Sequence, residues 1–320
     1  MALAIALVGW GGGWLWTKGR VESELDATAA RMKAAGGAFV WSGRRISGYP
    51  FRFDVDFSGL NWRGPDGWGV SAPELRSETS VFALGHWIAY APAGVSLIRP
   101  RGGAVRIAAQ VLRASISDAG GRPPTVSLEG QNLTFTPATG AAPYLLTSAG
   151  QLHFKSRAGP HDQVAFLIEV DDAKASSGSK IAAVASSGAV NFEAEAICDH
   201  AHAMTGPGWT SAMRSWAIAG GKAQIRRLRF QAGPFETDAH ESGLAIGPDG
   251  RLVGQLGVKR GAAALAALAG SGAMRSDAAR TAMEALHVDQ TGAGQTAVLT
   301  FRDGRMLLGP VALGPSPKVY

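Results

Sequence analysis

Apolar and polar residues alternate along most of the chain from Phe39 onward, a pattern typical of strands that bury one face. The clearest case is the segment 51–58, where three aromatic residues and a valine share one face and charged or hydroxyl side chains occupy the other. The same period of two recurs at 126–128, 133–135, 152–154, 164–170, 190–196, 225–230 and 252–258. The pattern predicts a body rich in β-strands.

Short turns separate the predicted strands. Asp66-Gly67, Asp249-Gly250 and Asp303-Gly304 are dipeptides that favour hairpin turns, and 120–124 has the composition of a loop. Strands joined by such short turns are antiparallel, because a parallel crossover needs a dozen or more residues. We therefore expect a large curved antiparallel sheet or a sandwich, and the pattern leaves open whether it forms one domain or two.

Helical periodicity in the body is confined to a few segments. Trp209, Met213 and Trp216 are spaced as on one helix face, an alanine-rich stretch covers 262–269, and a helix is predicted to begin at Ser276. The expected fold class is mainly β (α+β), with short helices in the C-terminal third. A soft boundary at 201–208 is the one candidate for a division within the body, 38–320.

The N-terminal segment 1–17 contains no charged side chain. As a helix it would extend about 25 Å at ~1.5 Å per residue, and Trp10, Trp14 and Trp16 cluster near its end as in an interfacial aromatic belt. We predict a transmembrane anchor over 1–17 and an amphipathic helix over 18–37. A cleaved signal peptide and a buried core helix are the alternatives.

The charges that follow this segment complicate its orientation. Lys18 and Arg20 come directly after it and no basic residue precedes it. The positive-inside rule, taken alone, keeps the body in the cytoplasm, and a start a few residues upstream would remove the conflict.

Composition narrows the class of function. The net charge is +6, but no run of Lys and Arg is interleaved with aromatic residues, so we expect no nucleic-acid partner. Diffuse positive charge suits an anionic lipid surface better. Cys198 is the only cysteine, which excludes an intramolecular disulfide.

Sequence motifs of catalysis are missing: the chain has no P-loop, G-x-S-x-G elbow, H-E-x-x-H or C-x-x-C pair. The densest polar cluster, Cys198-Asp199-His200-Ala201-His202, carries donor atoms that suit zinc or copper. Adjacent ligands cannot close a tetrahedral site without a distant partner, and the other histidines are scattered. We predict a polar loop here, with no metal, no cofactor and no catalytic residue, and hence a protein that is not an enzyme.

The segment Gly48-Tyr49-Pro50-Phe51-Arg52-Phe53-Asp54-Val55 resembles the G-[YWF]-P-x-R-F-D signature of the bacterial envelope family called domain of unknown function 2125 (DUF2125). Motifs at 216–221, 248–254 and 303–310 follow in the family's order, so the resemblance covers nearly the whole chain. It implies a single-pass protein of the bacterial inner membrane with its body in the periplasm, and it implies no activity. The family loosely resembles AsmA-like envelope proteins, whose long β grooves are associated with lipid handling.

Two functions fit these observations. In the first, the apolar face formed by Phe51, Phe53, Val55 and Phe57 binds or shields a phospholipid or other apolar ligand, since burial contributes about 0.8 kcal/mol per methylene without any special polar group. In the second, the protein is a structural or interaction scaffold with a filled core. An open groove favours the first and a solid core the second, and the sequence does not identify protein partners.

Overall fold

The computed structural model describes residues 2–118, 121, 123–177, 179–185, 188–233, 235–239, 242–259, 296–309 and 311–320, with isolated positions between 260 and 295. The helices predicted at 262–269 and from Ser276 lie in the part of the chain outside these continuous ranges.

Among the continuously described residues, helices are few and strands are many. The helices are α1 (Ala2–Ala34), α2 (Lys180–Ala185), the 3-10 turn η1 (Ala201–Ala203) and α3 (Trp209–Ile218). The first strands are β1 (Ala38–Val40), β2 (Gly43–Ser47), β3 (Arg52–Arg63), β4 (Gly69–Ser80), β5 (Trp87–Tyr90), β6 (Val95–Arg99), β7 (Gly103–Ala108), β8 (Val111–Ser117), β9 (Thr125–Pro137) and β10 (Leu146–Gly159). The others are β11 (Gln163–Ala175), β12 (Val190–Cys198), β13 (Lys222–Ala232), β14 (Phe235–Ala239), β15 (Ser242–Ile246), β16 (Leu252–Lys259), β17 (Thr296–Arg302), β18 (Arg305–Leu308) and β19 (Val311–Pro315).

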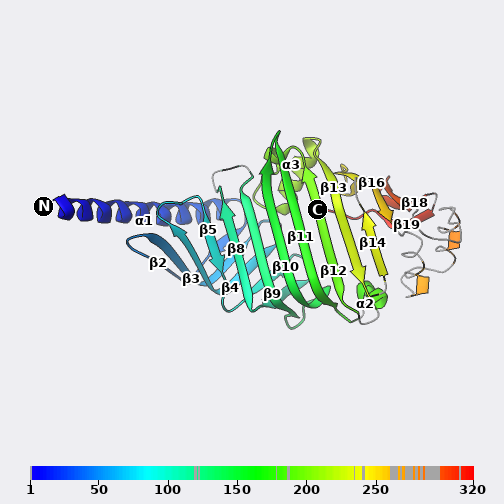
Figure 1. Cartoon of the computed structure of the whole chain (residues 1–320), viewed down its shortest axis with the longest axis horizontal. Coiled ribbons are helices and arrows are strands. Elements are labelled where there is room, and N and C mark those ends of the chain that lie inside the picture. Colours follow the sequence, from blue (N-terminus) through cyan, green and yellow to red (C-terminus); the bar gives the residue numbers. More distant parts are fainter. Residues whose placement is uncertain are drawn as a thin grey trace.

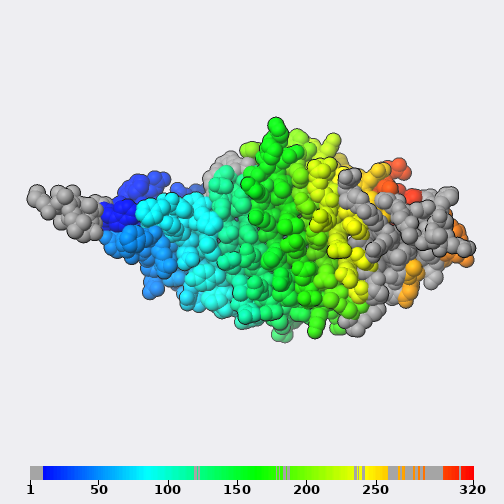
Figure 2. Space-filling model, viewed as in Figure 1, coloured from blue at the N-terminus to red at the C-terminus, as the bar shows by residue number. Residues whose placement is uncertain are grey.

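All these strands belong to one sheet with antiparallel ladders. β1 and β2 pair with successive parts of β3, which pairs with β4. β4 pairs with two short strands, β5 and β6. These pair in turn with β8 and β7, and both β7 and β8 pair with β9. The strands β9 to β13 then follow in chain order. In Figure 1 the strands lie side by side along the long axis, and Figure 2 shows the same succession as consecutive bands of colour. The predicted mainly β, antiparallel body is confirmed, as a single sheet.

The N-terminal segments predicted as an anchor and an amphipathic helix form one helix, α1, whose N-terminal end extends beyond β2 in Figure 1. No helix among the described residues is long and apolar enough to cross a membrane. The uncharged stretch is interrupted by glycines, and α1 runs on into the charges that begin at Lys18. The anchor over 1–17 stays a prediction. The helix ends at Ala34, Gly36 in the following turn has φ +83°, and the amide of Gly37 donates to the carbonyl oxygen of Met32.

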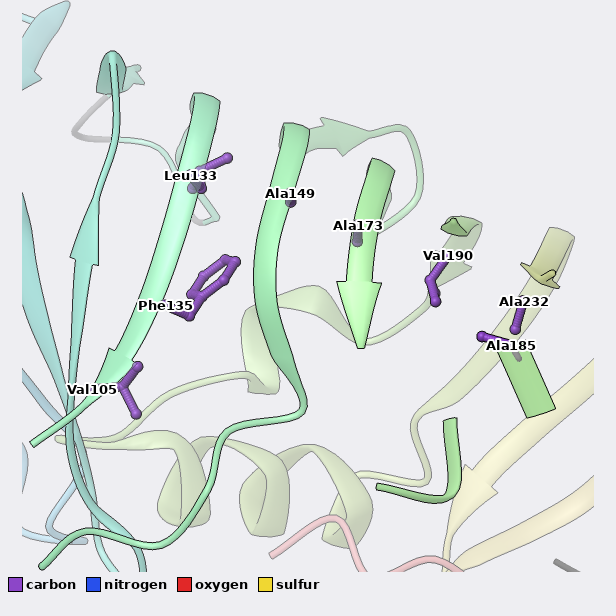
Figure 3. Close-up of a cluster of buried hydrophobic side chains, with 8 residues drawn as sticks. All are labelled: Val105, Leu133, Phe135, Ala149, Ala173, Ala185, Val190 and Ala232. Atoms are coloured by element: carbon purple, nitrogen blue, oxygen red, sulfur yellow. The ribbon is translucent and has the colours of Figure 1, made fainter. Parts of the chain in front are cut away.

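Three clusters of buried side chains lie along the sheet. The first joins α1 to β2, β3 and β4 through Trp14, Phe53, Val55 and Phe57, among others. The second, drawn in Figure 3, gathers Val105, Leu133, Phe135, Ala149, Ala173, Val190 and Ala232 from the strands β7 to β13 and Ala185 from α2. The third packs Met213 and Trp216 of α3 against β11 and β12. The segment 201–208 lies between β12 and α3, and β12 and β13 on either side of it are neighbours in the sheet.

Candidate functional site

Cross-strand pairing aligns apolar residues in a row across one face of the sheet, which we call the inner face. The row consists of Ile46 (β2), Val55 (β3), Ser77 (β4), Ala89 (β5), Ala114 (β8), Leu128 (β9), Phe154 (β10), Ile168 (β11), Ala194 (β12), Leu228 (β13), Ala239 (β14) and Val258 (β16). Directly opposed residues in antiparallel strands share a face. Eleven steps of about 4.8 Å make this apolar row roughly 50 Å long, and Ser77 is its single polar member.

The residues one position away form a charged row on the opposite, outer face. It runs through Arg45, Asp56, Arg76, Tyr90, Arg113, Glu129, His153, Glu169, Glu193, Arg229 and Asp238. Several neighbours form ion pairs, including Arg113 with Glu129 at 2.5 Å and Arg45 with Asp56 at 3.5 Å. The two rows show that the outer face is the wet side of the sheet and that the inner face is the candidate ligand-binding side.

The apolar row is covered at its ends and open near its centre. Val55 at the α1 end is 2% exposed, and Ala239 near the other end is 0% exposed. In the middle, Ile168 of β11 is 36% exposed, and Ile116 of β8, on the same face, is 41% exposed. A partly open apolar strip therefore lies between the elements that cover the two ends of this face.

A cleft lies between α1 and the inner face of β3 to β5. Its larger chamber, of about 680 Å³, is lined by Trp16, Thr17, Arg20, Val21, Glu24, Leu25 and Thr28 of α1 and by Val55, Phe57, Ser77, Leu84 and Trp87 of the sheet and its β4–β5 turn. A second chamber, of about 450 Å³, shares Trp16, Thr17 and Leu84 with the first and adds Trp10, Gly13, Trp14, Phe53 and Val81. We call the two chambers together the α1 cleft, which follows about 27 Å of the helix axis from residue 10 to residue 28.

Three of the four residues predicted to form the ligand-binding face line this cleft. Val55 and Phe57 line the larger chamber and Phe53 the smaller. Phe51 lies outside it and is 64% exposed, because β3 begins only at Arg52 and Phe51 belongs to the preceding turn. The alternation that joins Phe53 to Phe57 therefore does not extend back to Phe51.

The turn before β3 fastens α1 to the sheet. The indole Nε1 of Trp10 donates to the carbonyl oxygen of Pro50 at 3.0 Å, and that of Trp14 donates to the carbonyl oxygen of Arg52 at 3.2 Å. The Trp14 ring also stacks on Phe53, with 5.1 Å between centroids. Gly48 has φ +100°, and a Cβ there would lie 2.7 Å from the carbonyl oxygen of Arg52. The residues that carry the family resemblance thus build the place where the helix docks.

The polar cluster around Cys198 has a structural arrangement. Burial raises the pKa of the Cys198 thiol to about 12. Asp162 accepts hydrogen bonds from the backbone amide and the ring of His202, and these lower the pKa of its carboxyl. Burial opposes ionisation of Asp199, but hydrogen bonds from the Lys222 amide and from the His200 ring lower its pKa overall. Within the described part of the chain, no three His, Cys, Asp or Glu residues are grouped so as to hold a metal ion.

The sequence did not reveal the wall of the cleft opposite Val55. Leu84 and Trp87 line it from the end of β4 and the start of β5, where the apolar run Val81, Phe82, Ala83, Leu84 has no strand period. The helix contribution had a signal, since Trp14, Val21 and Leu25 recur at spacings compatible with one helix face.

Residues 14–317 match the model of the DUF2125 family, described as an uncharacterized protein conserved in bacteria. The match begins within α1, at the residue that stacks on Phe53, and ends beyond β19. No curated protein and no solved structure matches the chain.

Proposed function

The chain belongs to the DUF2125 family, whose description names no activity, and we propose that it binds an apolar ligand without catalysing a reaction. The ligand class is a phospholipid acyl chain or a molecule of similar chemistry. The observation that carries the proposal is the α1 cleft, a chamber of about 680 Å³ with largely apolar walls. Its floor includes Val55, a member of the apolar row that continues into the half-open centre of the inner face.

The lining of the cleft suits a long chain with one polar end. Val21, Leu25, Phe57 and Trp87 supply apolar wall, whereas Arg20 and Glu24 supply charge along the helix side. Sixteen methylenes would gain about 13 kcal/mol from burial, against association costs of roughly 4–15 kcal/mol. Eight methylenes would gain only about 6 kcal/mol, so affinity should increase about fourfold per methylene until the cleft is full.

The proposal also includes the location of the protein in the cell. The family resemblance and the diffuse positive charge support a position at the bacterial inner membrane with the body in the periplasm. A phospholipid ligand would be abundant there.

A scaffold without a ligand is the second candidate, and one observation favours it. Phe53, Val55 and Phe57 are 1–5% exposed, so the core beneath α1 is largely filled by the protein's own side chains. The two candidates differ in whether the volume beside these residues is occupied by another molecule.

Lipid analysis of the full chain separates the candidates. The protein is purified in mild detergent, its intact mass is measured under native conditions, and its organic extract is analysed. It is then delipidated and titrated with phospholipids of increasing acyl length. At about 100 times its Kd, a ligand adds about 2.7 kcal/mol of stability. Over 320 residues with ~2.1 cal/mol/K of unfolding entropy each, this raises Tm by roughly 4 °C.

A stoichiometric apolar molecule together with a chain-length-dependent rise in Tm would support the binding function. An intact mass equal to that of the protein alone, with no rise in Tm for any acyl length, would leave the scaffold as the function. A rise that is the same for short and long chains would indicate recognition of the headgroup and would contradict the cleft as the site.

A further inference from the structure

Exposed aromatic and aliphatic side chains gather where α1 meets two turns of the sheet. Their exposed fractions are 40% for Trp10, 63% for Leu15, 64% for Trp16, 53% for Tyr49, 64% for Phe51, 75% for Phe82 and 44% for Leu84. They come from α1, from the β2–β3 turn and from the β4–β5 turn. We call this surface the end patch.

Contacts between the three segments fix the end patch in place. The ring centroids of Trp10 and Phe82 lie 5.8 Å apart, and those of Trp14 and Tyr49 lie 5.6 Å apart. The amide of Val81 donates to the carbonyl oxygen of Phe51 at 3.1 Å, which ties the two turns to each other. The patch is therefore one surface, formed by residues distant in sequence and held by hydrogen bonds and ring contacts.

The charged side chains within the segments that form the end patch are basic. The segments 2–21, 46–53 and 79–90, which supply it, contain no Asp or Glu and include Lys18, Arg20 and Arg52. The Arg20 guanidinium lies 5.1 Å from the centroid of the exposed Trp16 ring. Arg52 is paired with Asp54 and Glu78, and Lys18 lies 3.9 Å from Glu22, so Arg20 provides the positive charge beside Trp16 at the rim.

We propose that the end patch is a docking surface for an anionic lipid bilayer. Exposed tryptophan, tyrosine and phenylalanine beside basic residues are the side chains that settle at the headgroup level of membranes. A negatively charged surface complements Arg20 at the rim, whereas a neutral apolar partner would leave this guanidinium without complementary charge. Trp10, Trp16 and Leu84 belong both to the patch and to the α1 cleft, so the cleft opens on this surface.

Vesicle flotation with the full chain tests the proposal. The probes are vesicles of phosphatidylethanolamine with phosphatidylglycerol, and vesicles of phosphatidylcholine alone. The variant Phe51→Ser/Phe82→Ser changes two exposed turn residues, neither of which lines the cleft, and removes the ring contact between Phe82 and Trp10. Ile218→Ser/Val298→Ser removes two exposed apolar side chains elsewhere, 81% and 42% exposed, and is the matched control.

The wild-type chain and the control should float with the anionic vesicles, and the turn variant should partition at least about tenfold less. Arg20→Gln should reduce the preference for anionic vesicles by about fivefold. Equal flotation of the turn variant and the wild type would overturn the proposal. So would a concentration-dependent dimer in sedimentation that the turn variant abolishes, since the patch would then bind a second copy of the chain.

The flotation result does not depend on whether the protein binds an acyl ligand in the cleft. A turn variant that no longer floats but is still stabilised by a soluble acyl ligand shows docking and binding as separate functions. If the wild-type chain floats but no acyl ligand stabilises it, the docking proposal stands and the proposed binding function fails.

Discussion

Filling the α1 cleft from within should abolish ligand binding without unfolding the protein. Ser77 is suited to this change because it is the polar member of the apolar row, lies directly opposite Val55 and Ala89, and lines the larger chamber. In Ser77→Phe, a phenyl ring enters a chamber of about 680 Å³ at the level of β4. The ring interrupts the cleft part of the way along its length.

The energetic balance of this substitution can be worked from its contacts. Ser77 Oγ donates one hydrogen bond to the carbonyl oxygen of Val55 at 3.2 Å, and losing it costs about 0.5–1.5 kcal/mol. Burying the phenyl ring contributes about 1.5–3 kcal/mol, so the free energy of unfolding should be unchanged or slightly higher. A ring that displaces about five methylenes of a bound chain removes about 4 kcal/mol of binding, close to a thousandfold in Kd.

The assay is calorimetric titration of the delipidated variant with the longest acyl ligand that the wild type binds. Ser115→Phe is the control, because Ser115 is paired with Ser127 on the outer face of β8 and its ring would enter solvent. Wild-type affinity in Ser77→Phe, with an unchanged Tm, would refute the cleft as the binding site.

Two further predictions concern stability and reactivity. Trp14→Ala should lower the free energy of unfolding by about 3–5 kcal/mol, because the indole is 9% exposed, stacks on Phe53 and donates to the Arg52 carbonyl oxygen. Urea unfolding measures this loss. A loss below 1 kcal/mol would mean that α1 is not held by this contact. The Cys198 thiol, whose pKa burial raises to about 12, should resist alkylation at pH 8 in the folded protein and react readily in denaturant. Rapid modification of the folded chain, followed by intact mass, would contradict that burial.

The alternation of apolar and polar residues predicted which side chains of a strand are buried. Strand register determines which of these side chains are aligned across the sheet. The period of two in β3 identified Phe53, Val55 and Phe57 as buried because it depends only on neighbouring residues. The same period places Asp172 and Val170 on one face of β11. The structure has Asp172 at φ +50° and a register shift between Val170 and Ala173, which returns Ala173 to the core beside Val190. A positive φ at an aspartate has no clear signal in a single sequence, so the continuous inner face was not predictable.

The N-terminal helix shows a different limit. An uncharged segment with three tryptophans has the composition of a membrane anchor, and composition does not reveal whether its partner is lipid or protein. The fold adds contacts that composition does not show, since Trp10 and Trp14 donate to the carbonyl oxygens of Pro50 in the β2–β3 turn and of Arg52 at the start of β3, 40 and 38 residues away. The family signature was recognisable as a turn, but its role as the docking site for the helix depends on that long-range pairing.

The position of α1 links the two proposals physically. The helix covers the apolar row where Val55 is 2% exposed, and the row emerges from beneath it toward Ile168, which is 36% exposed. An acyl chain that enters at the end patch would therefore pass along the cleft between α1 and the strands β3 to β5 before it reaches the open centre of the inner face. Each methylene kept out of water on this path avoids about 0.8 kcal/mol, so even a short exposed gap would be a substantial barrier. A continuous apolar row, rather than a single deep pocket, is the arrangement that such a path requires.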